Sequence, residues 1–229
     1  MNPSIVPHLV KKDFLILRKT IIGFCLVSLT AIVITSLLFE RIPNWAFVNL
    51  AFMLLIAPAA ACGIVLLMRS IVMEKVKSTQ SFIMSLPVTV KEFTLAKVLV
   101  NLPIFTAFWV ATSSVTFYFA FGLGIFPYGA IPFVSMILLG VFVAYICILS
   151  TSLLFQSHGI TILSILIFEM GTSAYLWVVV YLDPIANYIY GQTSVWNSTA
   201  IGIITTQVLI AIFMLLMTMY VQNKKRDFI

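Results

Sequence analysis

Charged residues are scarce in this chain of 229 residues: Asp, Glu, Lys and Arg together make up 9% of it, whereas 62% of its residues are hydrophobic. A typical soluble domain carries about 25% charged residues. The scarcity excludes a water-soluble globule, and it also excludes disordered, collagen-like and coiled-coil chains, which need a polar or repetitive composition. A chain this apolar uses lipid as its solvent, where only helices or closed barrels satisfy the backbone hydrogen bonds.

The common catalytic and nucleotide-binding motifs are also missing. The chain contains no G-x-x-x-x-G-K-[ST], no H-E-x-x-H, no G-x-S-x-G and no C-x-x-C. His8 and His158 are its only histidines, and neither has Cys, Asp or Glu at metal-ligand spacing. We therefore expect no catalytic residues, no metal site and no cofactor bound by this chain itself.

Long apolar runs are what the sequence does contain. Barrel strands would alternate apolar and polar residues in units of about ten, but these runs are continuous and long enough to cross a bilayer as helices. The expected fold is all-α, a single polytopic transmembrane domain over residues 1–229 with six membrane-spanning helices. The spans are expected at about 20–39, 45–68, 98–121, 132–155, 160–182 and 200–221.

The basic residues predict the orientation of these spans. Twelve of the thirteen Lys and Arg residues fall in the N-terminal segment, the 69–97 connection or the C-terminus, and only Arg41 falls on the other side. Because cytoplasmic loops carry the excess of Lys and Arg, both termini and the 69–97 connection should be cytoplasmic. Topology therefore accounts for the net charge of +6, and no nucleic-acid partner is expected.

Two segments on the predicted cytoplasmic side are not simple membrane spans. Residues 8–19 are mildly amphipathic, which fits either a helix lying among lipid headgroups or a charged lead-in to the first span. Residues 74–86, wound as a helix, place Glu74 and three serines on one side and apolar residues on the other, and Pro87 should end that helix. This pattern indicates either a docking helix on the cytoplasmic face or an ordinary solvated loop. A second helix should begin near Thr89 and lead into the third span.

One further feature lies in a connection on the exterior side, and another lies inside the membrane. The connection 183–198 is aromatic, and Tyr188, Tyr190 and Trp196 are of the types that anchor chains at membrane interfaces, which predicts a short interfacial or re-entrant element. Glu169 lies about halfway along the fifth span, where a charge is costly. It is either a polar point on a substrate path or a latch between helices, or a protonated carboxyl hydrogen-bonded to a neighbouring Ser, Thr or Tyr.

The segment 74–97 resembles the cytoplasmic signature of ABC-2 type transporter permeases. The similarity rests on Glu74, on Lys77-Ser78-Thr79, on the turn Ser85-Leu86-Pro87-Val88-Thr89, and on Lys91-Glu92 and Ala96-Lys97. It departs from the family pattern at Ser78, where Gly is common, and at Val90, where Arg is common.

The resemblance implies a permease subunit in a bacterial cytoplasmic membrane. Such a subunit pairs with a second copy of itself or a sister permease, and a separate cytoplasmic ABC ATPase binds the ATP and Mg²⁺. Residues 74–86 would be the coupling helix. The residues expected to couple the chain to the ATPase are Glu74, Lys77, Thr79, Phe82, Leu86 and Pro87. The expected activity is export of a peptide, lipid-like or hydrophobic drug substrate.

Two other functions remain open. A secondary transporter should show more charge inside the membrane and inverted repeats, whereas this chain has one intramembrane acid and no visible repeat. A membrane scaffold or sensor subunit without transport of its own is the second alternative.

Overall fold

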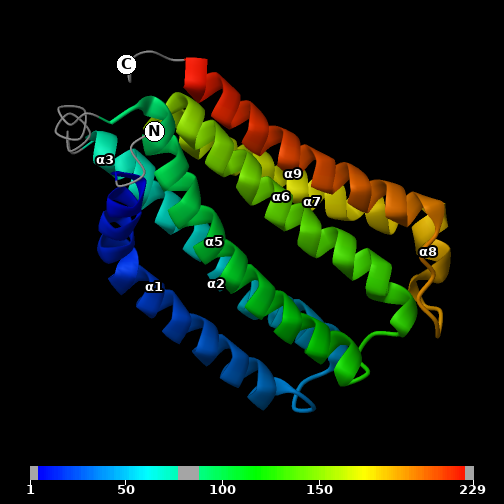
Figure 1. Ribbon diagram of the computed structural model, residues 1–229. Helices are drawn as coiled ribbons and strands as arrows, with labels where there is room; N and C mark the ends of the chain where they lie inside the picture. The colour runs from blue at the N-terminus through cyan, green and yellow to red at the C-terminus, as the bar shows by residue number, and fades with distance from the viewer. Residues whose placement is uncertain (1–4, 77–87, 225–229) are drawn as a thin grey trace.

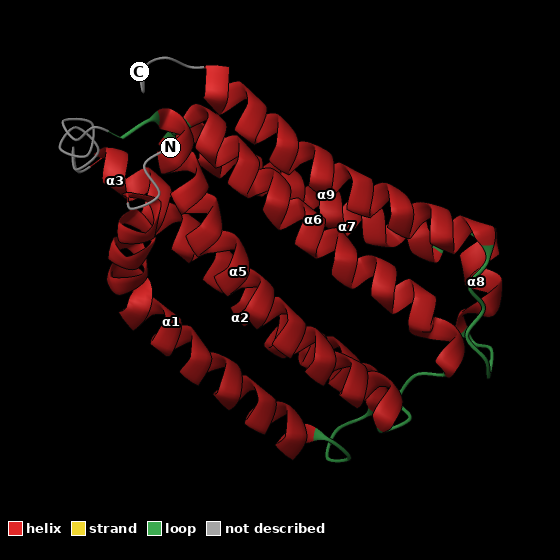
Figure 2. Ribbon diagram, viewed as in Figure 1, coloured by secondary structure: helices red, strands yellow, loops and turns green. Residues whose placement is uncertain are grey.

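A computed structural model describes residues 5–76 and 88–224 of the chain. Every regular element in these two ranges is helical (Figure 2), and six of the helices are long and apolar enough to cross a membrane. The main elements are α1 (Ile5–Leu38), α2 (Asn44–Leu67), α5 (Val90–Phe117), α6 (Ile131–Phe155), α7 (His158–Val180) and α9 (Ser198–Lys224). The predicted all-helical, multi-pass architecture is confirmed at this level.

Short elements extend or join these helices. The π-helix η1 (Met68–Val72) and the one-turn helix α3 (Met73–Val76) continue α2. The π-helix η2 (Tyr118–Gly122) continues α5, and the 3-10 turn η3 (Tyr128–Ala130) leads into α6. Helix α8 (Asp183–Ile189) lies between α7 and α9.

The helices form two groups of three. Helices α1, α2 and α5 pack together, and α6 packs against both α7 and α9 (Figure 1). The largest apolar core joins the two groups: Phe105 of α5 stacks on Tyr145 of α6 with their ring centroids 3.6 Å apart. Gly63 of α2 makes room for this stack, because a Cβ there would lie 2.6 Å from the Phe105 ring.

Two of the predicted spans begin earlier in the structure than the apolar runs suggested. Helix α1 starts at Ile5 and includes the amphipathic residues 8–19, and its N-terminal turns run in a different direction from the rest (Figure 1). Helix α5 starts at Val90, so the helix predicted near Thr89 and the third span are one continuous element. Both extensions place charged residues on helices that continue into the apolar bundle.

Different elements lie at the two ends of the bundle. The start of α1, the end of α9 and α3 lie at one end, and α8 lies at the other (Figure 1). At the α8 end, the Gly129 N–H donates to the Gly191 carbonyl over 2.9 Å. A Cβ on Gly129 would lie 2.1 Å from the Tyr188 carbonyl oxygen, so only glycine fits this contact.

Candidate functional site

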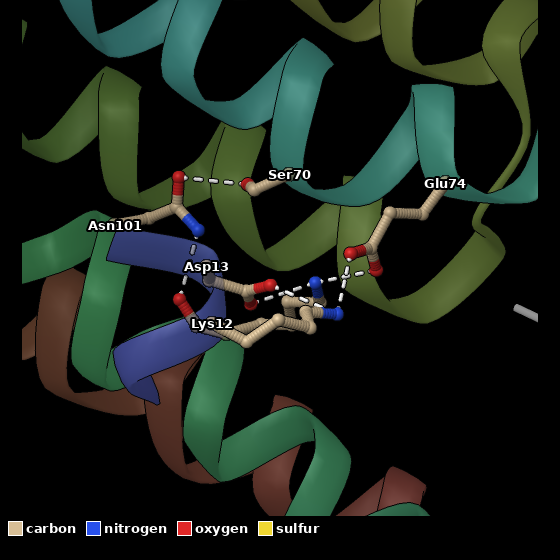
Figure 3. Close-up of polar contacts among 6 residues, drawn as sticks. Lys12, Asp13, Ser70, Glu74 and Asn101 are labelled. Atoms are coloured by element: carbon tan, nitrogen blue, oxygen red, sulfur yellow. Dashed lines mark hydrogen bonds and ion pairs between the residues drawn. The ribbon is translucent and has the colours of Figure 1, made fainter. Parts of the chain in front are cut away.

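Four charged side chains meet at the bundle end that carries α3. Lys12 and Asp13 come from α1, Glu74 from α3 and Lys97 from α5, and we call these four residues the ionic cluster (Figure 3). Lys97 lies at its centre, with Nζ 2.6 Å from Glu74 Oε2 and 2.8 Å from Asp13 Oδ2. Lys12 Nζ bridges the same carboxylates, 2.8 Å from Glu74 Oε1 and 3.1 Å from Asp13 Oδ1. Two cations and two anions therefore form a closed ring of zero net charge.

The ionic cluster is almost completely shielded from solvent. The Lys97 and Asp13 side chains are 1% and 2% exposed, Glu74 is 8% exposed, and only Lys12 reaches the surface at 35%. Burying charges costs several kcal/mol per ion unless geometry and further contacts compensate. The ring provides that compensation for the carboxylates, and the Phe93 ring lies 5.0 Å from Lys97 Nζ as a cation–π partner.

The pKa of Glu74 reflects its position in the ionic cluster. Burial on its own would raise the pKa of the Glu74 carboxyl, but the ammonium groups of Lys97 and Lys12 outweigh burial and hold that pKa below its ordinary value. Glu74 is therefore ionised at neutral pH, and it contributes a full negative charge to the ring.

Neutral polar groups extend the contacts of the cluster along α5. Ser70 Oγ in η1 donates to Asn101 Oδ1 over 3.0 Å, and Asn101 Nδ2 donates to the carbonyl of Lys97 over 2.9 Å (Figure 3). The π-helix η1 that carries Ser70 lies directly before Glu74, and single π turns of this kind are frequent at functional sites. The helical segment from η1 to α3 is thus fixed to α5 by polar contacts on two successive turns.

The beginning of α5 is fixed independently. Thr89 and Glu92 form a capping box, in which Thr89 Oγ1 accepts from the Glu92 N–H and the Thr89 N–H donates to Glu92 Oε2. Val88, just before the cap, packs with Val6 and Leu9 of α1 in a small apolar cluster that also contains Phe93. This cap is the structural reason why the helix begins where the sequence predicted.

The sequence-predicted coupling residues are placed only in part. Glu74 belongs to the ionic cluster, whereas Lys77, Thr79, Phe82, Leu86 and Pro87 lie outside the described residues. Glu74, the first residue of the predicted coupling helix, and Val88, two residues after its end, are both held against α1. The chain is therefore anchored against α1 on both sides of residues 77–87.

Sequence reasoning did not assign Lys12, Asp13 and Lys97 to any site. Lys12 and Lys97 contributed only to the predicted topology, and Lys97 also to the family resemblance. The sequence did contain a signal for Asp13. It is an acid among basic residues beside an apolar run, and an acid that is buried needs a partner. The sequence alone could not show that α1 and α5 bring these charges together.

Glu169 and the aromatic anchors lie elsewhere. Glu169 is the central residue of α7 and is exposed, and its carboxylate makes no hydrogen bond or ion pair within the described residues. Tyr188, Tyr190 and Trp196 are 44%, 85% and 45% exposed at the α8 end of the bundle. Within residues 5–76 and 88–224, no three His, Cys, Asp or Glu residues are grouped so that they could hold a metal ion.

Comparisons with protein-family models, characterised proteins and solved structures found no match to this chain. The residues and their geometry therefore carry the functional argument.

Proposed function

We propose that this chain is the membrane-spanning permease subunit of an ABC transporter. It forms the substrate path, pairs with a second permease and is driven by a separate cytoplasmic ATPase that binds ATP and Mg²⁺. Its substrate is a peptide, lipid-like molecule or hydrophobic drug, which is exported across a bacterial cytoplasmic membrane.

One observation carries the proposal: the segment that resembles a coupling helix is attached at both of its ends to the same helices. Glu74, at its start, is held by Lys12 of α1 and Lys97 of α5, and Val88, just after its end, packs on α1. A force applied to residues 77–87 would therefore act on α1, α2 and α5 together. Transmission of ATPase closure to membrane helices requires such an attachment, whereas a solvated loop does not.

The orientation belongs to the same proposal. Six spans would put both termini on one side, and the placement of twelve of the thirteen basic residues favours that side being cytoplasmic. Single cysteines in a Cys-free background test this assignment in intact cells. Reagent from outside should label exposed positions at Asn44, Tyr128 and Gln192, whereas labelling at Gln80 or Lys224 would reverse it.

The decisive test of function is whether the chain assembles with a separate ABC ATPase. Phe82 is the largest apolar residue of the coupling segment, and loss of a central aromatic anchor costs about 2–4 kcal/mol, or roughly 30- to 1000-fold in affinity. Phe82→Ala should therefore release the ATPase during purification or uncouple ATP hydrolysis from transport. Tyr190→Ala, an exposed aromatic at the opposite end, is the matched control and should leave assembly intact.

Three outcomes would contradict the proposal. Full assembly and full ATP-driven transport by Phe82→Ala would remove the coupling role from this segment. Transport that needs an ion gradient and no ATPase would favour the secondary transporter, and the absence of any transport with a bound partner would favour the scaffold.

A further inference from the structure

The first turns of α1 carry exposed cations that the ionic cluster does not use. Lys11, Arg18 and Lys19 are exposed, and none of them forms an ion pair within the described residues. Arg69 of η1 is also exposed, and its Nη1 donates to Thr20 Oγ1 over 2.6 Å, so its guanidinium lies against α1 at the residue that follows Lys19. We call Lys11, Arg18, Lys19 and Arg69 the α1 basic surface.

The acids at this end of the bundle do not neutralise the α1 basic surface. Three acids of the described residues lie here, and all three are buried: Asp13, Glu74 and Glu92. The first two are already paired inside the ionic cluster. The exposed acids of the described residues lie in the α1–α2 turn, in the middle of α7 and at the start of α8: Glu40, Glu169 and Asp183. The exposed charge of the described residues at the α3 end is therefore of one sign, and it is positive.

Exposed apolar side chains lie between these cations. On the turns from Lys11 to Lys19 they are Phe14 at 48%, Leu15 at 57% and Ile16 at 53% exposure. After Lys19 the helix contains no charged residue up to its end at Leu38. The exposed side of α1 thus changes at Lys19 from mixed basic and apolar to uncharged. This is the change expected where a helix passes from the headgroup layer into the hydrocarbon of a bilayer.

A phospholipid with a net negative headgroup fits both properties of this surface. Its phosphate oxygens accept hydrogen bonds from ammonium and guanidinium groups, and Arg69 uses only one of its five N–H groups on Thr20 among the contacts of the described residues. Its acyl chains can cover Leu15 and Ile16, which are exposed beside the cations. A zwitterionic lipid offers the same phosphate, but its own cation opposes the positive surface.

Other occupants match only one of the two properties. An acidic segment of a soluble protein would pair with the cations, but it would not cover apolar side chains on a helix that continues into the membrane. A second copy of the chain lacks the complementary charge, because the exposed acids of its described residues lie away from this end.

We propose that the α1 basic surface binds the headgroups of anionic phospholipids. Arg18, Lys19 and Arg69 contact the phosphate, and Leu15 and Ile16 contact the acyl chains. This binding needs neither an ATPase nor a transported substrate, so it goes beyond the proposed function and is tested without it.

The experiment asks which lipid lies beside a chosen position. Leu15→Cys in a Cys-free background carries a fluorescent label, and the full chain is reconstituted in phosphatidylcholine vesicles. Quenching by phosphatidylglycerol with a spin-labelled acyl chain is compared with quenching by phosphatidylcholine with the same label. The anionic lipid should be preferred by about fivefold or more, because one Lys or Arg near anionic lipid contributes about 1 kcal/mol. Leu216→Cys, an exposed position on α9, is the positional control and should be quenched nearly equally by the two lipids.

Charge variants identify the residues that produce the preference. Arg18→Gln/Lys19→Gln removes two exposed cations without an ion-pair partner, and it should lower the preference at position 15 by at least about fivefold. Lys224→Gln is the matched control, because it removes an exposed cation at the same end of the bundle but from the other group of helices (Figure 1). It should leave the preference at position 15 unchanged. Arg69→Gln should lower that preference, and an unchanged value would remove η1 from the site.

Equal quenching by the two lipids at position 15 would overturn the proposal. A preference of the same size at position 216, or an equal loss in Lys224→Gln, would also overturn it, since either result assigns the effect to the net charge of the chain. Displacement of the anionic lipid by a water-soluble glutamate peptide would assign the surface to an acidic protein segment instead. A preference that is confined to position 15 and lost in Arg18→Gln/Lys19→Gln would confirm the site.

Discussion

Glu74 and Glu169 are two carboxyl groups on a mainly apolar bundle, and their surroundings are opposite. Glu74 is buried and is held by two lysines from two other segments, whereas Glu169 is exposed in the middle of a span with no partner in the described residues. The Glu74 carboxylate is part of a closed ring of ion pairs, and the Glu169 carboxyl belongs to no ion pair in the described residues. We therefore expect the paired carboxyl to fix helices together and the unpaired one to contribute little to stability.

The largest effect is expected from Lys97→Met. Lys97 is the only nearly inaccessible cation of the ionic cluster, and its loss leaves Asp13 and Glu74 facing each other with only Lys12 to compensate. Breaking a buried ion pair by removing one partner costs about 3–5 kcal/mol. The free energy of unfolding, measured by denaturant titration in mixed micelles, should fall by that amount.

Lys91→Met is the matched control for this variant, because Lys91 is exposed on the same helix. It should change the free energy of unfolding by no more than about 0.5 kcal/mol. If the two variants lose equal stability, the ionic cluster does not hold α1, α3 and α5 together.

A smaller loss is expected from Glu74→Gln. The amide keeps the shape of the side chain, Lys97 retains Asp13, and Lys12 is partly exposed to solvent. Hydrogen bonds to charged groups contribute about 1.5–3 kcal/mol, so we expect a loss of about 2 kcal/mol. Because the residues are in contact, the double variant Glu74→Gln/Lys97→Met should lose less than the sum of the two single losses, and strict additivity would contradict direct coupling.

The part of the architecture that follows local rules was predictable from the sequence. Continuous apolar runs gave the number of spans, and the beginning of α5 near Thr89 was expected and is explained by its capping box with Glu92. The early start of α1 was missed, because a charged amphipathic segment and an apolar span have different compositions although they form one helix.

The two candidate sites depend on long-range packing, which periodicity does not report. Asp13 and Lys97 are 84 positions apart in the sequence, and their contact exists only because α1 packs against α5. Glu169 was recognisable from its depth alone, but the residues that line a small crevice together with it come from α2, α5 and α6. Individual charged residues could thus be recognised from the sequence, but their partners could not.

Acidification tests the paired carboxyl directly. The pKa of Glu74 is lowered from its ordinary value of 4.5, so the unfolded chain takes up the proton at a higher pH than the folded one. The stability that the Glu74 charge contributes is therefore fully present above about pH 5, and it declines as the pH falls through the lowered pKa. The difference in unfolding free energy between the unmodified chain and Glu74→Gln should be constant from about pH 8 to pH 5 and shrink below it. A difference that shrinks already between pH 7 and pH 6 would contradict the lowered pKa.

The smallest effect on stability is expected from Glu169→Gln, and it separates the two carboxyl groups most clearly. Glu169 has no hydrogen-bond or ionic partner in the described residues, so the substitution removes no such contact, and a neutral amide is tolerated at membrane depth at least as well as a carboxyl group. The free energy of unfolding in the same titration should stay within about 0.5 kcal/mol of the unmodified chain or rise. Glu169→Gln and Glu74→Gln are the same chemical change, so the contrast between them measures the effect of the different surroundings of the two carboxyl groups. If Glu169→Gln loses as much stability as Glu74→Gln, then Glu169 is a latch between helices.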